Sequence, residues 1–178
     1  IEAGASIVND ISALQSDLKM ADVVSSSGVP IVLMHMQGTP LTMQTAPIYE
    51  NAVSEIKMFL TQAVQFAQKR NILRSRIIID PGIGFGKTAE QNLALIRDLR
   101  AFKSLRLPIL VGASRKSFIR NSLGFAQDLP PSSGPIETAT QAAVAASVMN
   151  GAHIVRVHDV AAARIAVDMI DAIKLGGN

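Results

Sequence analysis

The chain has 178 residues, which is enough for one ordinary domain with a sizeable core. Hydrophobic residues make up 48% and charged residues 17%, so the composition excludes an intrinsically disordered chain. The net charge of +3 is spread without a long basic run, and no apolar run reaches the roughly 18 residues that span a bilayer. We therefore expect a single domain over residues 1–178, without a nucleic-acid or membrane partner. Cysteine is absent, which excludes disulfides and cysteine-ligated zinc and is compatible with the cytoplasm.

Strand-like and helix-like segments alternate along the whole chain. Ile1–Gly4 is interpreted as the last turn of a helix, and without an initiator Met or a signal peptide we expect the natural protein to start further upstream. Near-continuous apolar runs predict buried strands at Ser6–Asn9, Pro30–Met34, Arg76–Ile79, Pro108–Val111 and Ile154–Val157. Apolar residues spaced three and four apart predict helices at Met20–Ser26, Tyr49–Arg70, Ala89–Phe102, Ile136–Met149 and Ala161–Leu175. Gly124–Pro135 is predicted to be a surface loop.

A strand followed by a helix, repeated roughly every 25 to 45 residues, requires right-handed crossovers and hence a parallel sheet. Two α/β architectures fit: an open doubly wound sheet, or part of a (β/α)₈ barrel. Composition does not decide between them. No Gly-x-Gly-x-x-Gly pattern follows the first strand, which argues against a dinucleotide site. Both folds place a site at the carboxyl ends of the strands, where this chain carries polar residues.

The first two predicted strands end in residues with both structural and functional interpretations. The amide of Asn9 can bind the edge of a heterocycle, although an Asx turn or a helix cap is the commoner role of an Asn9-Asp10 pair. In the second strand, Met34 can supply a polarizable floor for a flat ring. His35 is interpreted as a satisfied buried histidine. The polar loop through residues 42–44 (Thr-Met-Gln) is expected to close over a ligand.

The third strand is the most informative, because it runs into Asp80-Pro81-Gly82-Ile83-Gly84-Phe85-Gly86-Lys87. Asp80 follows three β-branched residues, and its carboxylate can pair with the N–H groups of a guanidine-like ring edge. The alternate glycines, Gly84 among them, allow the backbone to approach a ligand closely, and Phe85 can lie over an aromatic ring. The alternative is an ordinary tight turn. A nucleotide P-loop does not fit, because Gly82 and Lys87 are one residue too close.

The last two predicted strands end in cations. In Gly112–Ser117 (Gly-Ala-Ser-Arg-Lys-Ser) a helix begins, so Ser117 and the free N–H groups suit a carboxylate or a phosphate. An N-cap with solvated Arg and Lys side chains is the alternative. Arg156 and His158 are two apart in a strand and point to the same face, so they can bind phosphate or pyrophosphate together. Asp159 either orients His158 or, in the safer interpretation, caps the next helix.

Taken together, these motifs resemble those of dihydropteroate synthase, in order and in spacing. The resemblance is carried by Asn9-Asp10, residues 33–36 (Leu-Met-His-Met), Asp80 to Lys87, Ser114-Arg115-Lys116-Ser117 and Arg156-Val157-His158-Asp159. It covers essentially the whole chain and implies a (β/α)₈ TIM barrel of the pterin-binding type, of which about five βα units, strands four to eight, are present. The implied activity is that of a transferase of folate biosynthesis. It condenses 6-hydroxymethyl-7,8-dihydropterin diphosphate with 4-aminobenzoate and releases pyrophosphate.

The resemblance also implies a role for each candidate site residue. The pterin ring would contact Asn9, Asp80 and Lys116, in a pocket lined by Met34 and Gly112; Gly84 also belongs to the substrate-binding set. Pyrophosphate would be held by Arg156 and His158. The carboxylate of 4-aminobenzoate would bind Ser117 with Phe85 beside its ring, and sulfonamides would compete there. The expected catalytic residues are Asp80, Lys116, Arg156 and His158.

Two departures from the family pattern stand out. The family's first three strands are missing, together with the Asn expected to bind the Mg²⁺ cofactor, so no metal ligand is expected in this chain. Residues Asp128–Pro135 replace the family's usual acidic-Arg-Leu sequence. This loop is expected to lie away from the pocket, so the change bears on the surface and dimer contacts of an expected homodimer more than on the chemistry. The alternatives are a pterin-binding methyltransferase module, which would not need Arg156 and His158, and a fragment that is inactive on its own.

Overall fold

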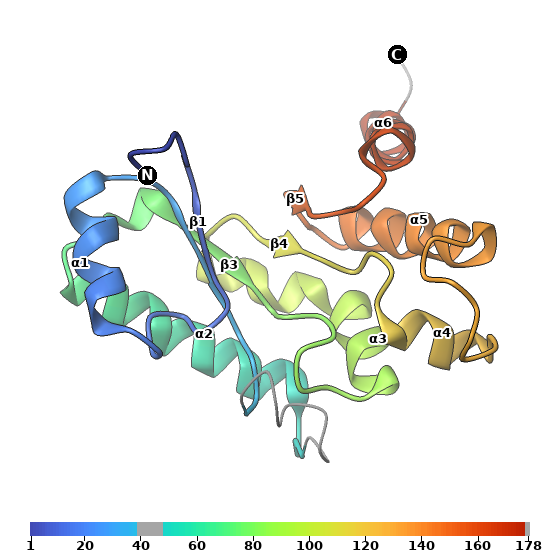
Figure 1. Ribbon diagram of the computed structural model, residues 1–178, viewed down its shortest axis with the longest axis horizontal. Helices are drawn as coiled ribbons and strands as arrows, with labels where there is room; N and C mark the ends of the chain where they lie inside the picture. The colour runs from blue at the N-terminus through green and yellow to red at the C-terminus, as the bar shows by residue number, and fades with distance from the viewer. Residues whose placement is uncertain (39–47, 177–178) are drawn as a thin grey trace.

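The computed structural model describes residues 1–38 and 48–176 of an α/β protein in which strands and helices alternate (Figure 1). The strands are β1 (Val8–Asp10), β2 (Ile31–Met34), β3 (Ile77–Asp80), β4 (Leu110–Val111) and β5 (Ile154–Val155). The α-helices are α1 (Leu18–Ser27), α2 (Ala52–Lys69), α3 (Ala89–Arg97), α4 (Ser117–Leu123), α5 (Gly134–Met149) and α6 (Val160–Leu175). Two 3₁₀ helices, η1 (Arg74–Arg76) and η2 (Leu99–Leu105), precede β3 and β4. Every predicted strand and helix overlaps one of these elements.

The five strands lie side by side in chain order and run parallel. β1, β2 and β3 form one hydrogen-bonded group and β4 and β5 a second. A parallel bridge between Ile79 and Ile109 connects the two groups. Within the part of the chain that the structure describes, β1 and β5 each keep an unpaired edge, so the sheet does not close on itself. The predicted parallel sheet of βα units is confirmed.

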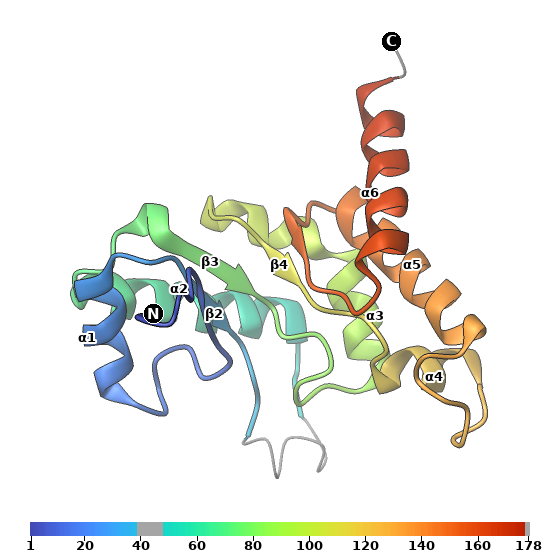
Figure 2. The same ribbon diagram turned by 45° about the horizontal axis from the view of Figure 1, so that its top comes forward.

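Alternate strand residues pack on opposite faces of the sheet. One set belongs to the large core shared with helices α1, α2 and α3, which cover one face of the sheet (Figure 2): Ile31, Leu33, Ile77 and Ile79. The other set forms a small separate cluster: Val32, Ile78 and Leu110. In a (β/α)₈ barrel, helices cover the outside while apolar layers fill the interior, and the two clusters correspond to these two sides.

Helices α1, α2, α3 and α6 start at residues whose side chains satisfy free backbone N–H groups. Asn51 caps α2 by accepting from the N–H of Ser54 at 3.0 Å. Thr88 and Gln91 form a reciprocal capping box at the start of α3. Asp159 caps α6 by accepting from the N–H of Ala162 at 2.9 Å, which confirms the capping interpretation of this residue. Each such cap stabilises its helix by about 1 kcal/mol.

Two predicted ends, those of the third helix and of the last strand, are wrong. The α-helix expected over Ala89–Phe102 ends at Arg97, and the chain continues as η2, which keeps Phe102 fully buried. Because a 3₁₀ turn repeats every three residues, the apolar spacing of this stretch suits either helix type. Ile1–Gly4 forms a turn closed by a 2.9 Å bond from the N–H of Gly4 to the carbonyl of Ile1, and its interpretation as the last turn of a helix stays a prediction. The last strand stops at Val155, two residues earlier than predicted.

Helix α6 extends away from the rest of the molecule at the β5 end of the sheet (Figure 2). It packs against α5, and Ala163 is its only fully buried residue within the described range. Large apolar side chains on α6 are exposed, among them Ile165, Met169 and Ile173. None of the helices in the described part of the chain has the length and apolar character needed to cross a membrane.

Candidate functional site at the carboxyl ends of the strands

Asp80 forms the centre of the site. It is the last residue of β3, lies opposite Met34 of β2, and has 6% of its surface exposed. Its Oδ1 accepts a 2.7 Å hydrogen bond from the N–H of Gly82. Burial raises the pKa of the Asp80 carboxyl, while that hydrogen bond and the cations Lys116, Lys87 and Arg156 favour its charged form. A buried carboxylate surrounded by cations can bind the N–H groups of a planar ligand strongly.

A buried lysine holds the loop that follows β3. The Nζ of Lys87 donates to the carbonyls of Gly82 at 2.9 Å and Phe85 at 2.8 Å, and lies 3.1 Å from Nδ1 of His35. Lys87 is 4% exposed, and burial lowers its pKa to about 7. Burial together with Lys87 lowers the pKa of His35 to about 3, so the imidazole is neutral and its Nδ1 accepts from the lysine. The interpretation of His35 as a satisfied buried histidine is confirmed; its ring also meets Phe59 edge-on at 4.8 Å.

Two glycines of this loop are required by close contacts. Gly82 has φ +72°, and a Cβ there would lie 1.9 Å from the carbonyl oxygen of His35. Gly84 has φ +81°, and a Cβ there would lie 2.7 Å from Cδ of Lys116. At Gly82 the neighbour is backbone, so only glycine permits this loop path, whereas at Gly84 the positive φ favours glycine and a Cβ would displace the Lys116 side chain. The Gly84 backbone therefore contacts Lys116, a candidate ligand-binding residue, and its approach to a ligand stays a prediction.

Lys116 reaches across from the β4 end to this loop. Its Nζ donates to the carbonyl of Ile83 and lies 4.4 Å from the ring centre of Phe85, a cation–π contact. Gly112 lies below it, since a Cβ on this residue would be 3.9 Å from the Lys116 Nζ. Burial lowers the pKa of Lys116 to about 8, and Asp80 opposes that shift. At neutral pH the residue therefore remains mostly cationic.

The second part of the site is a pocket of about 440 Å³. Its lining contains Gly112, Ser114, Lys116, Arg156 and His158. Pro131 also lines it, so the prediction that the loop of residues Asp128–Pro135 lies away from the pocket is wrong. Ser114 fixes the histidine in two ways: its Oγ lies 2.8 Å from Nδ1 of His158 and accepts from the backbone N–H of His158 at 3.3 Å. Since Nδ1 is engaged, Nε2 is the ring nitrogen left for a ligand. The pocket thus combines three groups that can bind an anion.

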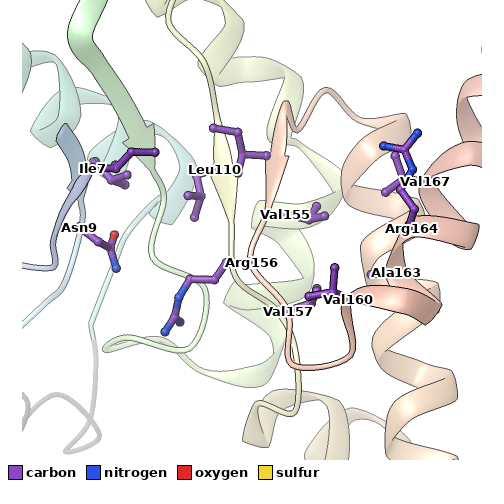
Figure 3. A pocket seen from close by; sticks show the side chains of 12 residues that line it. Ile7, Asn9, Leu110, Val155, Arg156, Val157, Val160, Ala163, Arg164 and Val167 are labelled. Atoms are coloured by element: carbon purple, nitrogen blue, oxygen red, sulfur yellow. The ribbon is translucent and has the colours of Figure 1, made fainter. Parts of the chain in front are cut away.

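A larger apolar groove of about 530 Å³ adjoins the site (Figure 3). Asn9 and Arg156 belong to its lining, and Arg156 extends from the end of β5 toward the side of the groove on which Asn9 lies (Figure 3). Asn9 is exposed and next to Asp10. The Asp10 carboxylate is used by the backbone, since it accepts from the N–H groups of Ser12 at 2.8 Å and Leu14 at 2.6 Å. Asp10 therefore makes the predicted Asx-type turn, and Asn9 alone is available to a ligand.

The two ends of the Ser-Arg-Lys-Ser motif face different partners. Ser117 is exposed and is the first residue of α4, as predicted. Arg115 is not solvated: it adopts φ +58° and forms an ion pair with Glu137 of α5, while its N–H donates to Thr140 at 3.2 Å. Arg115 thus ties the start of α4 to α5, and it also belongs to the lining of the 440 Å³ pocket.

The predicted site residues consequently fall into two groups. Lys116, Arg156, His158 and Gly112 share the 440 Å³ pocket, with Asp80 close enough to interact electrostatically with two of its cations. Met34, 3% exposed, and Phe85, half-buried, lie beside Asp80 and Lys116 respectively, and Asn9 lines the adjoining groove. The proposed ligand-covering loop at residues 42–44 lies outside the described residues. The roles of all these predicted site residues toward a ligand stay predictions.

Sequence reasoning missed two residues that shape the site. Asn92 of α3 is 1% exposed, and its side chain binds the loop around Gly84. The second is Ser114, which belongs to the Ser-Arg-Lys-Ser motif but whose contact with His158 the motif does not indicate. For Asn92 the signal was its place as a polar residue on the helix face that carries the buried Leu95 and Ile96. No local pattern indicated the second, because Ser114 and His158 are 44 residues apart.

The described residues do not fit a magnesium site. Within residues 1–38 and 48–176, no group of three or more His, Asp or Glu side chains could hold a metal ion. Magnesium prefers several oxygen ligands in octahedral geometry, and Asp80 by itself faces lysine and arginine.

Parallel βα units with polar groups at the carboxyl ends of their strands are typical of α/β proteins that bind ligands at this edge of the sheet. Comparison with known proteins identifies the family. Residues 1–158 match the family model described as "Pterin binding enzyme". The chain belongs to this family of pterin-binding enzymes.

Several relatives within the family are named dihydropteroate synthase. The dihydropteroate synthase of Synechocystis sp. is 41% identical over 173 residues, which cover 97% of this chain and 58% of the relative. The structure of the Yersinia pestis dihydropteroate synthase with a sulfonamide drug complex superposes with a TM-score of 0.91 at 33% identity, covering 98% of this chain and 61% of that one. The Xanthomonas albilineans dihydropteroate synthase in complex with 7,8-dihydropteroate gives 0.86 at 35% identity, covering 97% and 61%.

These likenesses confirm two predictions. The resemblance to dihydropteroate synthase is shown by sequence and by structure, and the fold is part of a pterin-binding (β/α)₈ barrel. The chain spans about three fifths of the length of these relatives.

Proposed function

We propose that this chain provides the pterin, 4-aminobenzoate and pyrophosphate-binding part of a dihydropteroate synthase. The observation that supports this most is the convergence of one carboxylate and three cationic or histidine groups. Lys116, Arg156 and His158 line one pocket, and Asp80 lies beside it. An anionic leaving group can be held by Arg156 and His158, and an N–H-rich pterin edge by the Asp80 carboxylate with Lys116 beside it.

The reaction fits this set of groups. The C–O bond to pyrophosphate breaks with help from the ring electrons of the dihydropterin, and the amine nitrogen of 4-aminobenzoate then bonds to the exocyclic carbon and loses a proton. Such a step depends on charge stabilisation and alignment rather than on a strong base. Arg156 and His158 would hold the departing pyrophosphate while Asp80 and Lys116 hold the pterin. Phe85 would border the aminobenzoate ring and Ser117 its carboxylate.

The finer features of the proposal come from the family resemblance. We propose that sulfonamides compete with 4-aminobenzoate at Phe85 and Ser117, that the enzyme is a cytoplasmic homodimer, and that Mg²⁺ is bound by residues outside this chain. The sulfonamide-bound Yersinia pestis relative supports the first of these. The rival function, a pterin-binding methyltransferase module, leaves the anion pocket at Arg156 and His158 without a use.

The test measures pyrophosphate release by two proteins. One is the 178-residue chain and the other is the same chain preceded by the first three βα units of a dihydropteroate synthase. We expect no release from the chain alone, and release from the extended protein only when both substrates are present. Release by the chain alone would refute the predicted inactivity of the fragment. A folded extended protein that binds methyltetrahydrofolate but neither 4-aminobenzoate nor the pterin diphosphate would refute the synthase and support the methyltransferase.

A further inference from the structure

We infer that Asn92 is a positioning residue for this site, acting on the ligand-binding groups through the loop of residues 82–88; the catalytic part of this inference rests on the function proposed above. Asn92 lies in the first turns of α3 and is 1% exposed. Of the residues expected to meet a ligand, its side-chain hydrogen bonds within the described part of the chain reach Gly84 alone, and there they engage the backbone N–H. Its side chain thus binds the loop itself.

The Asn92 amide is fully matched to this loop. Its Oδ1 accepts from the N–H of Gly84 at 2.6 Å, and its Nδ2 donates to the carbonyls of Thr88 at 2.7 Å and Lys87 at 3.3 Å. A buried amide is costly unless its donors and acceptor find partners, and here both Nδ2 hydrogens and the oxygen are used. The neighbouring buried positions of this helix hold Leu95 and Ile96, so packing alone would favour an apolar residue here.

The hydrogen bond to Gly84 fixes the part of the loop that meets Lys116. Gly84 stands between Ile83, whose carbonyl accepts from the Lys116 Nζ, and Phe85, whose ring lies 4.4 Å from the same Nζ. The Gly84 Cα also lies under the Lys116 side chain, where no Cβ fits. Asn92 thus determines where Phe85 and the ammonium of Lys116 stand relative to Asp80.

Lys87 and Asn92 bind different parts of the loop, which also receives hydrogen bonds from Tyr49 and Lys116 and donates one to Asp80. Lys87 binds the carbonyls of Gly82 and Phe85 from the side of the sheet. Asn92 binds the N–H of Gly84, between those two residues, from the side of α3. Loss of the lysine would leave a buried space beside Asp80, whereas loss of the Asn92 amide removes hydrogen bonds without removing a charge. A substitution at Asn92 therefore tests how the loop positions the ligand-binding groups without changing the charge of the site.

The experiment compares Asn92→Leu, which has nearly the same volume and no hydrogen bonds, with Gln91→Leu. Gln91 is the adjacent residue and its Oε1 accepts from the N–H of Thr88 at 2.8 Å, so its loss weakens the same helix start without touching Gly84. In the extended active protein, we expect Asn92→Leu to lower kcat/KM on the order of 10- to 100-fold, because small misplacements of aligned groups have effects of this size. The KM for 4-aminobenzoate should rise more than the KM for the pterin diphosphate, because Phe85 is the displaced side chain.

Two further readouts keep a positioning role apart from simple destabilisation. In the 178-residue chain, hydrogen exchange of the Gly84 amide should accelerate in Asn92→Leu while the amides of β3 keep their protection. Asn92→Asp keeps an acceptor for the N–H of Gly84. It should therefore retain more of the exchange protection of Gly84 than Asn92→Leu, and its KM for 4-aminobenzoate should rise less. The inference is overturned if Gln91→Leu, at a comparable loss of Tm, changes the KM values equally, or if Gly84 exchange is unchanged in Asn92→Leu. Absence of turnover in the unmodified extended protein would refute the proposed function and the catalytic part of the inference, while the exchange result would still decide the support of the loop.

Discussion

The buried pair of His35 and Lys87 makes a quantitative prediction about acid stability. The pKa of His35 falls from 6.5 to about 3 on folding, because burial and the neighbouring ammonium both disfavour the imidazolium. The folded state therefore binds fewer protons than the unfolded state between these two values. The stability linked to His35 is complete above pH 6.5 and is lost progressively as the pH falls toward 3.

The size of this effect follows from the two pKa values. At pH 7 the imidazole is largely neutral in both states, whereas at pH 5 it is protonated only in the unfolded state. The corresponding loss in the free energy of unfolding between pH 7 and pH 5 is about 2 kcal/mol. That is a large share of the roughly 5–15 kcal/mol by which a domain is stable.

Urea unfolding of the 178-residue chain, followed by circular dichroism at both pH values, measures this loss. His35→Gln keeps a polar acceptor near Lys87 and cannot titrate, so its unfolding free energy should fall about 2 kcal/mol less than that of the unmodified protein over the same interval. His153→Gln is the matched control, because this histidine is exposed. Equal pH dependence in the unmodified protein and in His35→Gln would refute the assignment of a neutral His35.

Two more predictions concern ligand affinity and backbone geometry. In the extended protein, Asp80→Ala and Lys116→Ala should each weaken pterin binding by about 1–3 kcal/mol, as measured by calorimetry, because each removes a charge-assisted hydrogen bond. Lys69→Ala, on the far end of α2, should leave the affinity unchanged, and an equal loss there would contradict a local role for the two site residues. Gly82→Ala should lower the free energy of unfolding by more than about 2 kcal/mol, since the added Cβ meets a backbone oxygen. Gly28→Ala has a similar φ of +67° but open space around it, so urea unfolding should show a smaller loss, about 1 kcal/mol; losses of equal size would refute the contact argument.

The sheet could be predicted because buried parallel strands have an unambiguous sequence. Ile77-Ile78-Ile79 has no polar residue, and its two faces are apolar because helices cover one and the barrel interior lies on the other. The strand ends then placed Asp80 and Arg156 at one edge. Periodicity could not separate the end of α3 from η2, because Leu99 and Phe102 are buried in either helix type.

The internal support of the site could not be predicted from local patterns. Lys87 was expected as part of a glycine-rich motif, but its partners include His35, which is 52 residues away and meets it only after β2 and β3 have paired. Arg115 was weighed as a solvated residue, and its ion pair with Glu137 depends on how α5 returns along α4. Contacts of this kind are made by the tertiary structure, and the residue types alone allow several partners.

The loop of residues 82–88 separates scaffolding from recognition. Lys87 and Asn92 hold it entirely through backbone N–H and carbonyl groups, which every residue has, whereas Phe85 contributes its ring to the Lys116 side of the site. A substitution at Phe85 would therefore change the surface offered to a small aromatic ligand while the loop keeps its path. If Phe85 borders the ligand ring as proposed, ligand preference can change at this position with little effect on folding.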